Sequence, residues 1–207
     1  MGGFAPVVAE NSIEVLGRGV LPEPARIPVG DVFHGWEENL WVEIEGVVLG
    51  PPEGSAEDLE LMSGSRRIAI AFSEAASPGG LAPYLDARIA VRGVYGAFFT
   101  AAGVFAGTHI LATSTSMLRV LEKAPEKPGE RTLASLSHFD LRGVPQHRIR
   151  VSGVVTFRDT SGRVYLQDGG DALRIAGAPG LGPQLHSRAT AEGFLATGGA
   201  CLLYTSA

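Results

Sequence analysis

The feature that most constrains the fold is a strand pattern with an internal glycine, which occurs twice. Residues 41–48, Trp-Val-Glu-Ile-Glu-Gly-Val-Val, return as residues 148–155, Arg-Ile-Arg-Val-Ser-Gly-Val-Val. In both copies apolar residues alternate with polar ones, which is the period-two pattern of a half-buried strand. Glycine inside a strand costs about 0.5–1 kcal/mol relative to alanine, so a repeated one predicts a bulge or a sharp bend. A strand that must bend indicates a small closed barrel.

The spacing of the repeat sets the domain organisation. Gly46 and Gly153 are 107 positions apart, and Gly93 and Gly193 are 100 positions apart, so the units match with shorter loops in the later one. Five strands, with a short element between the third and fourth, form the strand plan of an OB-fold barrel. We therefore predict an all-β fold of tandem OB-fold-like five-stranded barrels, the last one truncated.

The predicted boundaries divide the chain into four parts. They are residues 1–17 as the tail of a preceding OB-like module, 18–124 as a complete module with its flanking linker, 125–200 as a second module lacking its last strand, and 201–207 as an adapter-derived scar. The scar is proposed because residues 201–206, Cys-Leu-Leu-Tyr-Thr-Ser, match the translation of a sequencing adapter. Excluding it removes the single cysteine, so cysteine content indicates no redox compartment. The alternative is a natural strand with one buried cysteine.

Turn residues and apolar alternation predict the individual elements. In the complete module they are a short helix or turn at 29–36, strands at 41–50, 58–62, 66–72, 88–95, 103–112 and 117–121, and a turn or single helical turn at 79–86. In the second module they are a helix at 132–136 capped by Thr132, strands at 147–157, 162–168, 172–176 and 188–195, and a tight turn at 168–170. A further strand is expected to end at Leu16.

Composition narrows the functional classes. The 207 residues are 45% hydrophobic, with 28 Gly, 13 Pro and 7% aromatic residues, which is typical of a globular, turn-rich, all-β protein. The net charge of −5 disfavours the broad basic face that a sequence-independent nucleic-acid binder needs. The sequence has no apolar run long enough for a membrane span and no signal-peptide pattern in its first residues.

The sequence predicts no catalysis and no cofactor. It contains no nucleophile elbow, phosphate loop, zinc pattern or paired-carboxylate motif. The five histidines, at 34, 109, 138, 147 and 186, show no ligand spacing such as i, i+2 or i, i+4, so no metal site is predicted either.

Five residues are candidates for ligand binding. Tyr95, Phe98 and Phe99 form the densest aromatic cluster, and they could stack on bases or other flat ligands. The alternative, which we favour, is that Tyr95 and one phenylalanine fill the barrel while the other caps a hairpin. Tyr165 and Gln167 lie in a stretch similar to the second strand of nucleic-acid-binding OB modules, and alternation directs them outward while Val164 and Leu166 point inward.

Eight arginines lie mostly on polar strand faces. They are Arg88, Arg92, Arg148, Arg150, Arg158, Arg163, Arg174 and Arg188. Together they could form an anion-binding surface. The interpretation that we favour is a solvated face on which they alternate with carboxylates such as Glu43, Glu45 and Asp168.

Four stretches, residues 40–48, 87–96, 147–155 and 164–170, resemble the tandem OB-like modules in the extracytoplasmic sensor regions of bacterial sensor histidine kinases and diguanylate cyclases. The resemblance implies a periplasmic, non-catalytic sensor or spacer fragment. Its partners would be an unknown small molecule or protein and a covalently linked kinase or cyclase output domain, with membrane attachment through segments outside this sequence. The alternative is a nucleic-acid-binding OB-fold protein.

Overall fold

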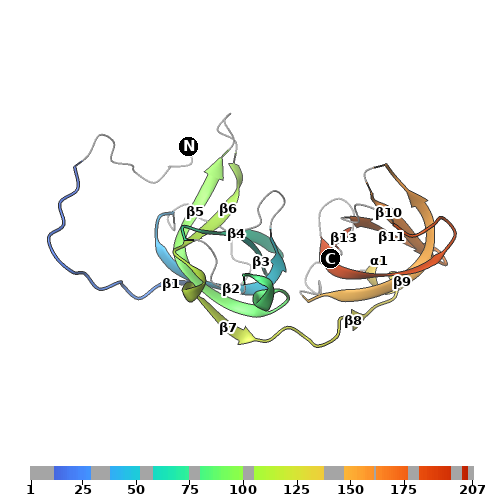
Figure 1. The fold of residues 1–207 in the computed structure, drawn as a ribbon, viewed down its shortest axis with the longest axis horizontal. Coiled ribbons are helices and arrows are strands. Elements are labelled where there is room, and N and C mark those ends of the chain that lie inside the picture. The colour runs from blue at the N-terminus through green and yellow to red at the C-terminus, as the bar shows by residue number, and fades with distance from the viewer. Residues whose placement is uncertain are drawn as a thin grey trace. The chain divides into compact units, whose positions relative to one another are not determined.

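A computed structural model of the chain describes residues 12–28, 38–51, 58–74, 80–99, 105–137, 147–160, 162–176, 182–196 and 202–204 (Figure 1). Contacts divide the chain into two compact units. The first comprises Met1–Pro83 and Arg88–Leu121, and the second comprises Tyr84–Ala87 and Glu122–Ala207.

The first unit is a closed β-barrel. Its elements are β1 (Ala25–Ile27), β2 (Trp41–Gly50), β3 (Leu59–Ser63), β4 (Arg66–Phe72), η1 (Ala82–Tyr84), β5 (Arg88–Phe99), β6 (Phe105–Ala112), η2 (Thr115–Met117) and β7 (Leu118–Glu122). The strands run in the order β2-β3-β4-β6-β5, and β5 pairs again with β2 to close the ring. The β4–β6 pairing is parallel and the other barrel pairings are antiparallel. This five-stranded Greek-key order is that of an OB-fold, as predicted.

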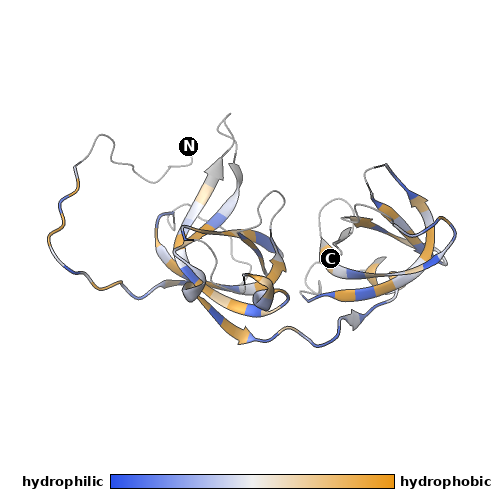
Figure 2. Cartoon of the chain, in the orientation of Figure 1, coloured by the Kyte–Doolittle hydropathy of each residue, from blue (hydrophilic) through white to orange (hydrophobic). Residues whose placement is uncertain are grey.

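Alternating side chains build the core of this barrel. Val42, Ile44, Leu61, Ile89 and Ile110 are almost fully buried, and Figure 2 shows apolar and polar residues alternating along the strands. Each buried aliphatic side chain contributes about 1.5–3 kcal/mol relative to leaving it exposed. The two-residue period predicted which apolar residues of β2 point inward, and the burial of Val42 and Ile44 confirms this prediction.

The repeated glycine has a different cause from the one that we predicted. The bulge in the β2–β3 pairing lies between Val48 and Gly50, not at Gly46. A Cβ on Gly46 would lie 2.3 Å from the carbonyl oxygen of Met62. Gly46 is therefore required because the β3 backbone passes too close to β2 for any side chain.

The second unit repeats this arrangement. Its elements are β8 (Gly129–Glu130), α1 (Leu133–Ser137), β9 (Ile149–Arg158), β10 (Val164–Asp168), β11 (Asp171–Ala176), β12 (Arg188–Ala196) and β13 (Leu202–Tyr204). β9 pairs with both β10 and β12, just as β2 pairs with both β3 and β5. The two-residue turn at Gly169 and Gly170 joins β10 to β11, with Gly169 at φ +60°, as the sequence predicted.

Helix α1 closes the core of the second unit. Leu133 and Leu136 are buried and pack in the same cluster as Ile149, Val151 and Leu166. The helix begins as predicted, because the backbone N–H of Ser135 donates to Oγ1 of Thr132 at 3.2 Å. The equivalent element expected at 29–36 lies outside the described residues.

In both units a short strand runs parallel to the first strand of the barrel. β1 pairs with β2, with Arg26 opposite Glu43, and β8 pairs with β9, with Glu130 opposite Arg150. These short strands come from the segments that lead into each barrel, so the repeat includes the linkers.

Strand β13 takes the place of the fifth strand of the second barrel. It pairs parallel with β11 and antiparallel with β12, just as β6 pairs with β4 and β5. Within residues 125–200 the described strands that contribute to the ring are β9, β10, β11 and β12. The fifth position is therefore occupied by residues from beyond the predicted boundary at 200.

The strand expected to end at Leu16 does not form. Residues 12–20 carry no strand, and Ile13, Val15 and Leu16 are 85–92% exposed. The described residues offer this segment no neighbouring strand, and without one its backbone cannot make ladder hydrogen bonds.

Among the residues that the structure describes, no helix combines the length and apolar character needed to cross a bilayer.

Candidate functional site

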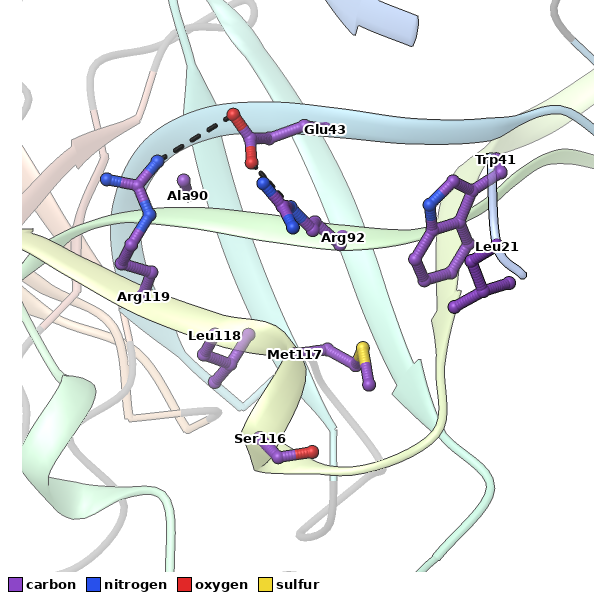
Figure 3. A pocket seen from close by; sticks show the side chains of 9 residues that line it. All are labelled: Leu21, Trp41, Glu43, Ala90, Arg92, Ser116, Met117, Leu118 and Arg119. Carbon is purple, nitrogen blue, oxygen red and sulfur yellow. Dashed lines mark hydrogen bonds and ion pairs between the residues drawn. The ribbon is translucent and has the colours of Figure 1, made fainter. Parts of the chain in front are cut away.

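The first unit carries a hollow of about 340 Å³ beside the β2–β5 pair. Its lining residues are Leu21, Trp41, Glu43, Ala90, Arg92, Ser116, Met117, Leu118 and Arg119 (Figure 3). They come from three parts of the chain, namely the segment that leads into the barrel, the barrel strands, and the η2–β7 segment that leaves it. A volume of this size lies within the usual range of small-molecule sites.

Strand register places the polar residues of the hollow. Trp41 and Glu43 are two positions apart on β2, so their side chains lie on the same face of the strand. Glu43 is directly opposite Arg92 on the antiparallel β5. Two backbone hydrogen bonds, from Asn39 N to Tyr95 O and from Tyr95 N to Leu40 O, hold the start of β2 against β5.

Glu43 is a buried carboxylate with arginine partners. The Nε of Arg92 donates to Oε2 of Glu43 at 2.7 Å, and Nη2 of Arg119 lies 3.7 Å from Oε1. Only 7% of the Glu43 side chain is exposed. The hydrogen bond from Arg92 holds the pKa of Glu43 below its ordinary value, against the opposing effect of burial. Glu43 is therefore ionised at neutral pH.

The other end of the hollow is apolar. In Figure 3, Trp41 and Leu21 lie toward one end of the view, and Glu43 lies with its two arginines toward the other. Met117 ends η2, whose first turn is capped because Ser116 N donates to Oγ of Ser114 at 3.3 Å. The hollow thus joins an aromatic and aliphatic surface to a charged one, which suits a ligand with a flat apolar body and a polar group.

Of the predicted aromatic cluster of the first unit, the structure describes the side chain of Tyr95. Tyr95 is 4% exposed and belongs to the barrel core, which agrees with the barrel-filling interpretation. Phe98 and Phe99 lie near the end of β5, opposite Gly107 and Phe105, but their side chains fall outside the described part of the structure. Tyr95 is therefore not available for stacking on a ligand.

Tyr165 and Gln167 lie on the outer face of β10, as alternation predicted. Val164 and Leu166 are buried, Tyr165 is half-buried and Gln167 is exposed. Gln167 donates from Nε2 to the carbonyl oxygen of Gly169 at 2.9 Å, so its amide supports the hairpin turn.

Tyr165 has an aromatic partner that the sequence analysis did not identify. Phe157 is directly opposite on β9, the ring centroids are 5.5 Å apart, and the rings meet edge to face at 67°. Phe157 is 55% exposed. The predicted strands at 147–157 and 162–168 are neighbours in a hairpin, but their bounds do not give the register that pairs Phe157 with Tyr165.

The hollow itself was missed by sequence reasoning. The sequence predicts no role for Leu21, and it predicts Trp41 only as part of the strand at 41–50. The available signal was the pair Glu43 and Arg92 on strands that the repeat predicts to be neighbours, with an aromatic residue two positions before the glutamate.

Most of the strand arginines pair with carboxylates, as favoured from the sequence. Arg88 donates to Glu45 at 2.9 Å, Arg150 pairs with Glu192, and Arg163 lies 3.5 Å from Asp159. The guanidinium Nε of Arg174 is buried and has no hydrogen-bond partner among the described residues. The arginines thus form several separate ion pairs.

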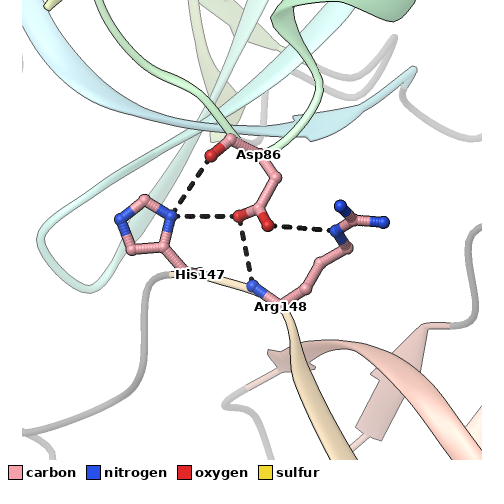
Figure 4. A network of polar contacts seen from close by, with 3 residues as sticks. All are labelled: Asp86, His147 and Arg148. Carbon is pink, nitrogen blue, oxygen red and sulfur yellow. Dashed lines mark hydrogen bonds and ion pairs between the residues drawn. The ribbon is translucent and has the colours of Figure 1, made fainter. Parts of the chain in front are cut away.

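A second polar cluster, within the second unit, is structural in character (Figure 4). The carboxylate of Asp86 is 1% exposed and accepts from the backbone N–H of Arg148 at 3.1 Å and from its Nε at 3.0 Å. Nδ1 of His147 lies 3.1 Å from Oδ1 of the same carboxylate. Both carboxylate oxygens therefore have donors, as a buried charge requires.

Within the described ranges, no three His, Cys, Asp or Glu side chains come together in a way that could hold a metal ion. His109, His147 and His186 are among those residues, whereas His34 and His138 lie outside them.

No family model matches the chain, and no curated protein matches it. Among solved structures, it is similar to the p204 HINb domain, with 9% identity and a TM-score of 0.28 over 78% of this chain and 91% of that one. It is also similar to the Ifi202 HINa domain in complex with 20-bp double-stranded DNA, with 13% identity and a TM-score of 0.29 over 79% and 91% of the two chains. Likeness at these values carries no inference about what the present chain binds.

Proposed function

We propose that the chain is a non-catalytic sensor and spacer module from the periplasmic part of a bacterial signal-transduction protein. Its role is to pass the binding of a small molecule or protein to an output domain, such as a kinase or a cyclase, elsewhere in the polypeptide. The resemblance of the repeated strands to tandem sensor modules motivates this proposal.

One observation carries the proposal furthest, namely the composition of the hollow in the first unit. Leu21 comes from the segment before the barrel, Trp41 and Arg92 from its wall, and Met117 and Arg119 from the segment that leaves it. A ligand in this hollow would contact the entering segment, the barrel wall and the leaving segment at the same time. Strand β7 continues directly into the segment 123–128 that leads to β8, so a change at the hollow has a short path out of the barrel.

The mechanism is a population shift and needs no chemical step. A ligand that binds only when Leu21 and the η2–β7 segment are in place stabilises that arrangement by its differential affinity. When β7 becomes less mobile, the segment 123–128 that follows it becomes less mobile as well.

Hydrogen exchange on this chain tests the proposal. Both tryptophans, Trp36 and Trp41, fall in the first unit, so their fluorescence reports ligand binding there. Single amino acids, monosaccharides, nucleosides and short carboxylates are titrated one at a time at millimolar concentration. A compound that changes the fluorescence is expected to slow exchange in residues 118–122 and to leave β10 and β11 unchanged.

Trp41→Leu tests whether the compound binds at this hollow, because the substitution keeps an apolar side chain and removes the indole. This variant should bind the same compound more weakly. A compound that binds at Trp41 without slowing exchange in β7 would rule out the coupling.

A nucleic-acid-binding role is the second candidate, and the aromatic pair of the exposed Phe157 and the half-buried Tyr165 favours it. Base stacking on an aromatic side chain contributes about 1–3 kcal/mol per base. Arg163 directly precedes β10, and Arg174 lies on β11 opposite Tyr165. The net charge of −5 works against this candidate.

Titration with single-stranded DNA at low salt separates the two candidates. Submicromolar binding that weakens steeply with salt, and that is lost in Phe157→Ala, would support the nucleic-acid role and count against the sensor role. Weak binding that is insensitive to Phe157 would leave the sensor role as the better proposal.

A further inference from the structure

The charged end of the hollow carries more positive than negative charge. Arg92 and Arg119 line it with a single carboxylate, that of Glu43. Arg26 is exposed and lies opposite Glu43 on the neighbouring strand β1. Two guanidinium groups thus face one buried carboxylate, with Arg26 on the strand beside it, and the local excess of positive charge favours an anion.

The arginines retain donors beyond those that Glu43 uses. Arg92 donates its Nε to Glu43, which leaves its two terminal nitrogens for other acceptors. The closest approach of Arg119 to Glu43, 3.7 Å, is too long for a hydrogen bond. The Arg119 side chain is 61% exposed and so can turn toward a ligand.

The apolar end fixes the shape of the ligand body. Trp41 offers a flat face, and Met117 and Leu21 offer flexible apolar side chains around it. Two positions along a strand span about 6.4–6.8 Å, which sets the spacing of Trp41 and Glu43 along β2. An aromatic ring carrying a carboxylate reaches across such a span.

From this arrangement we infer that the hollow binds a small aromatic carboxylate, with its ring against Trp41 and Met117 and its carboxylate on Arg119 and Arg92. The inference rests on the proposed binding function and names the ligand class for it. Glu43 has a positioning role, because its carboxylate accepts from Nε of Arg92 and holds that side chain in place.

Calorimetric titration with 2-naphthoate and its uncharged counterpart 2-naphthamide tests the inference. A charge-assisted hydrogen bond contributes about 1.5–3 kcal/mol, so naphthoate is expected to bind about tenfold tighter or better. Arg119→Gln should reduce this preference to about threefold or less, and Arg119→Lys should restore part of it.

Arg188→Gln is the matched control. It removes the same charge from an exposed position in the second unit, so the preference for naphthoate should not change. Thermal unfolding followed by circular dichroism checks that all variants are folded.

Three results would overturn the inference. They are equal affinity for naphthoate and naphthamide, a preference that survives Arg119→Gln, and equal affinity for hexanoate, which lacks the ring. If another compound class binds at Trp41 and slows exchange in β7, the ligand class is wrong and the sensor proposal stands. If naphthoate binds through Arg119 without changing that exchange, the ligand class stands and the coupling is wrong.

Discussion

The guanidinium Nε of Arg92 lies 2.7 Å from the carboxylate of Glu43, across the antiparallel strands β5 and β2. The second barrel has the same cross-strand pair with its charges exchanged. Arg150 stands at the position equivalent to Glu43, Glu192 stands at the position equivalent to Arg92, and the two form an ion pair. The repeat therefore preserves the pairing while the polarity of the pair differs between the units.

Loss of Arg92 should lower the free energy of unfolding more than loss of Arg150 does. Arg92→Ala leaves the buried Glu43 without its hydrogen-bond donor and is expected to lower the free energy of unfolding of the first barrel by about 2–3 kcal/mol. Arg150→Ala breaks a pair whose side chains are 43% and 38% exposed, so it should cost about 1 kcal/mol or less. Urea unfolding measures both, by tryptophan fluorescence for the first unit and by hydrogen exchange in β9 for the second. Equal costs would show that the burial of Glu43 does not matter.

The stability of the first barrel should fall in acid because of Glu43. Hydrogen bonding from Arg92 lowers the pKa of Glu43 from its ordinary value of 4.5. The folded state therefore holds this proton less tightly than the unfolded state does. The stabilisation that ionised Glu43 contributes is complete above pH 4.5. It is lost as the pH falls from 4.5 toward the pKa of Glu43 in the folded state. In Glu43→Gln the loss below pH 4.5 should be smaller, as measured by urea midpoints at a series of pH values. Glu14→Gln, in an exposed segment, is the control and should follow the parent chain.

His109 should add a separate pH dependence at a higher pH. Burial lowers the pKa of His109 from its ordinary value of 6.5, because the charged imidazolium is poorly solvated there. The unfolded state takes up this proton first, so stability is complete above pH 6.5 and decreases as the pH falls below it. His109→Gln should flatten the urea midpoints between about pH 7.5 and 5.5. An unchanged slope in this variant would assign the effect to another group.

The repeated glycines should differ in their tolerance of a methyl group. A Cβ at Gly46 would lie 2.3 Å from a backbone oxygen, whereas the closest atom to a Cβ at Gly153 is a backbone oxygen at 3.0 Å. Gly46→Ala is expected to destabilise the first barrel by about 3 kcal/mol or more, and Gly153→Ala to cost the second about 1 kcal/mol. Urea unfolding by fluorescence for the first unit, and by circular dichroism for the whole chain, measures the two. Gly129→Ala, with open space around the new Cβ, is the control.

The sequence predicted the elements whose signals are local. Alternation identified β2 and β9 and the buried faces of both, Gly169 and Gly170 located a hairpin, and Thr132 marked the start of α1. These features depend on backbone preference and on period, which a single sequence contains.

The features that depend on distant neighbours could not be predicted. Gly46 is explained by the position of Met62, and the hollow joins Leu21 to Trp41 and Met117. A bulge was the reasonable expectation for a strand glycine, because a sequence shows the cost of glycine but not the strand that crosses beside it. Sensing, periplasmic location and the absence of catalysis stay predictions.

The C-terminal strand β13 should stabilise both strands that it pairs with, β11 and β12. Leu203 lies between Ile175 of β11 and Leu195 of β12, so both edges of these strands depend on it. Deleting residues 201–207 is expected to speed hydrogen exchange in β11 and β12 by about tenfold or more, since two strand edges lose their ladder partners. Leu203→Pro should act similarly, because proline cannot donate to the ladder. Cys201→Ser keeps residues 202–204 of β13 unchanged and should not alter the exchange, and the fluorescence-detected unfolding of the first unit should be the same in all three variants. Unchanged exchange after deletion would show that β13 does not close the barrel in solution and that these residues behave as a tail foreign to the fold.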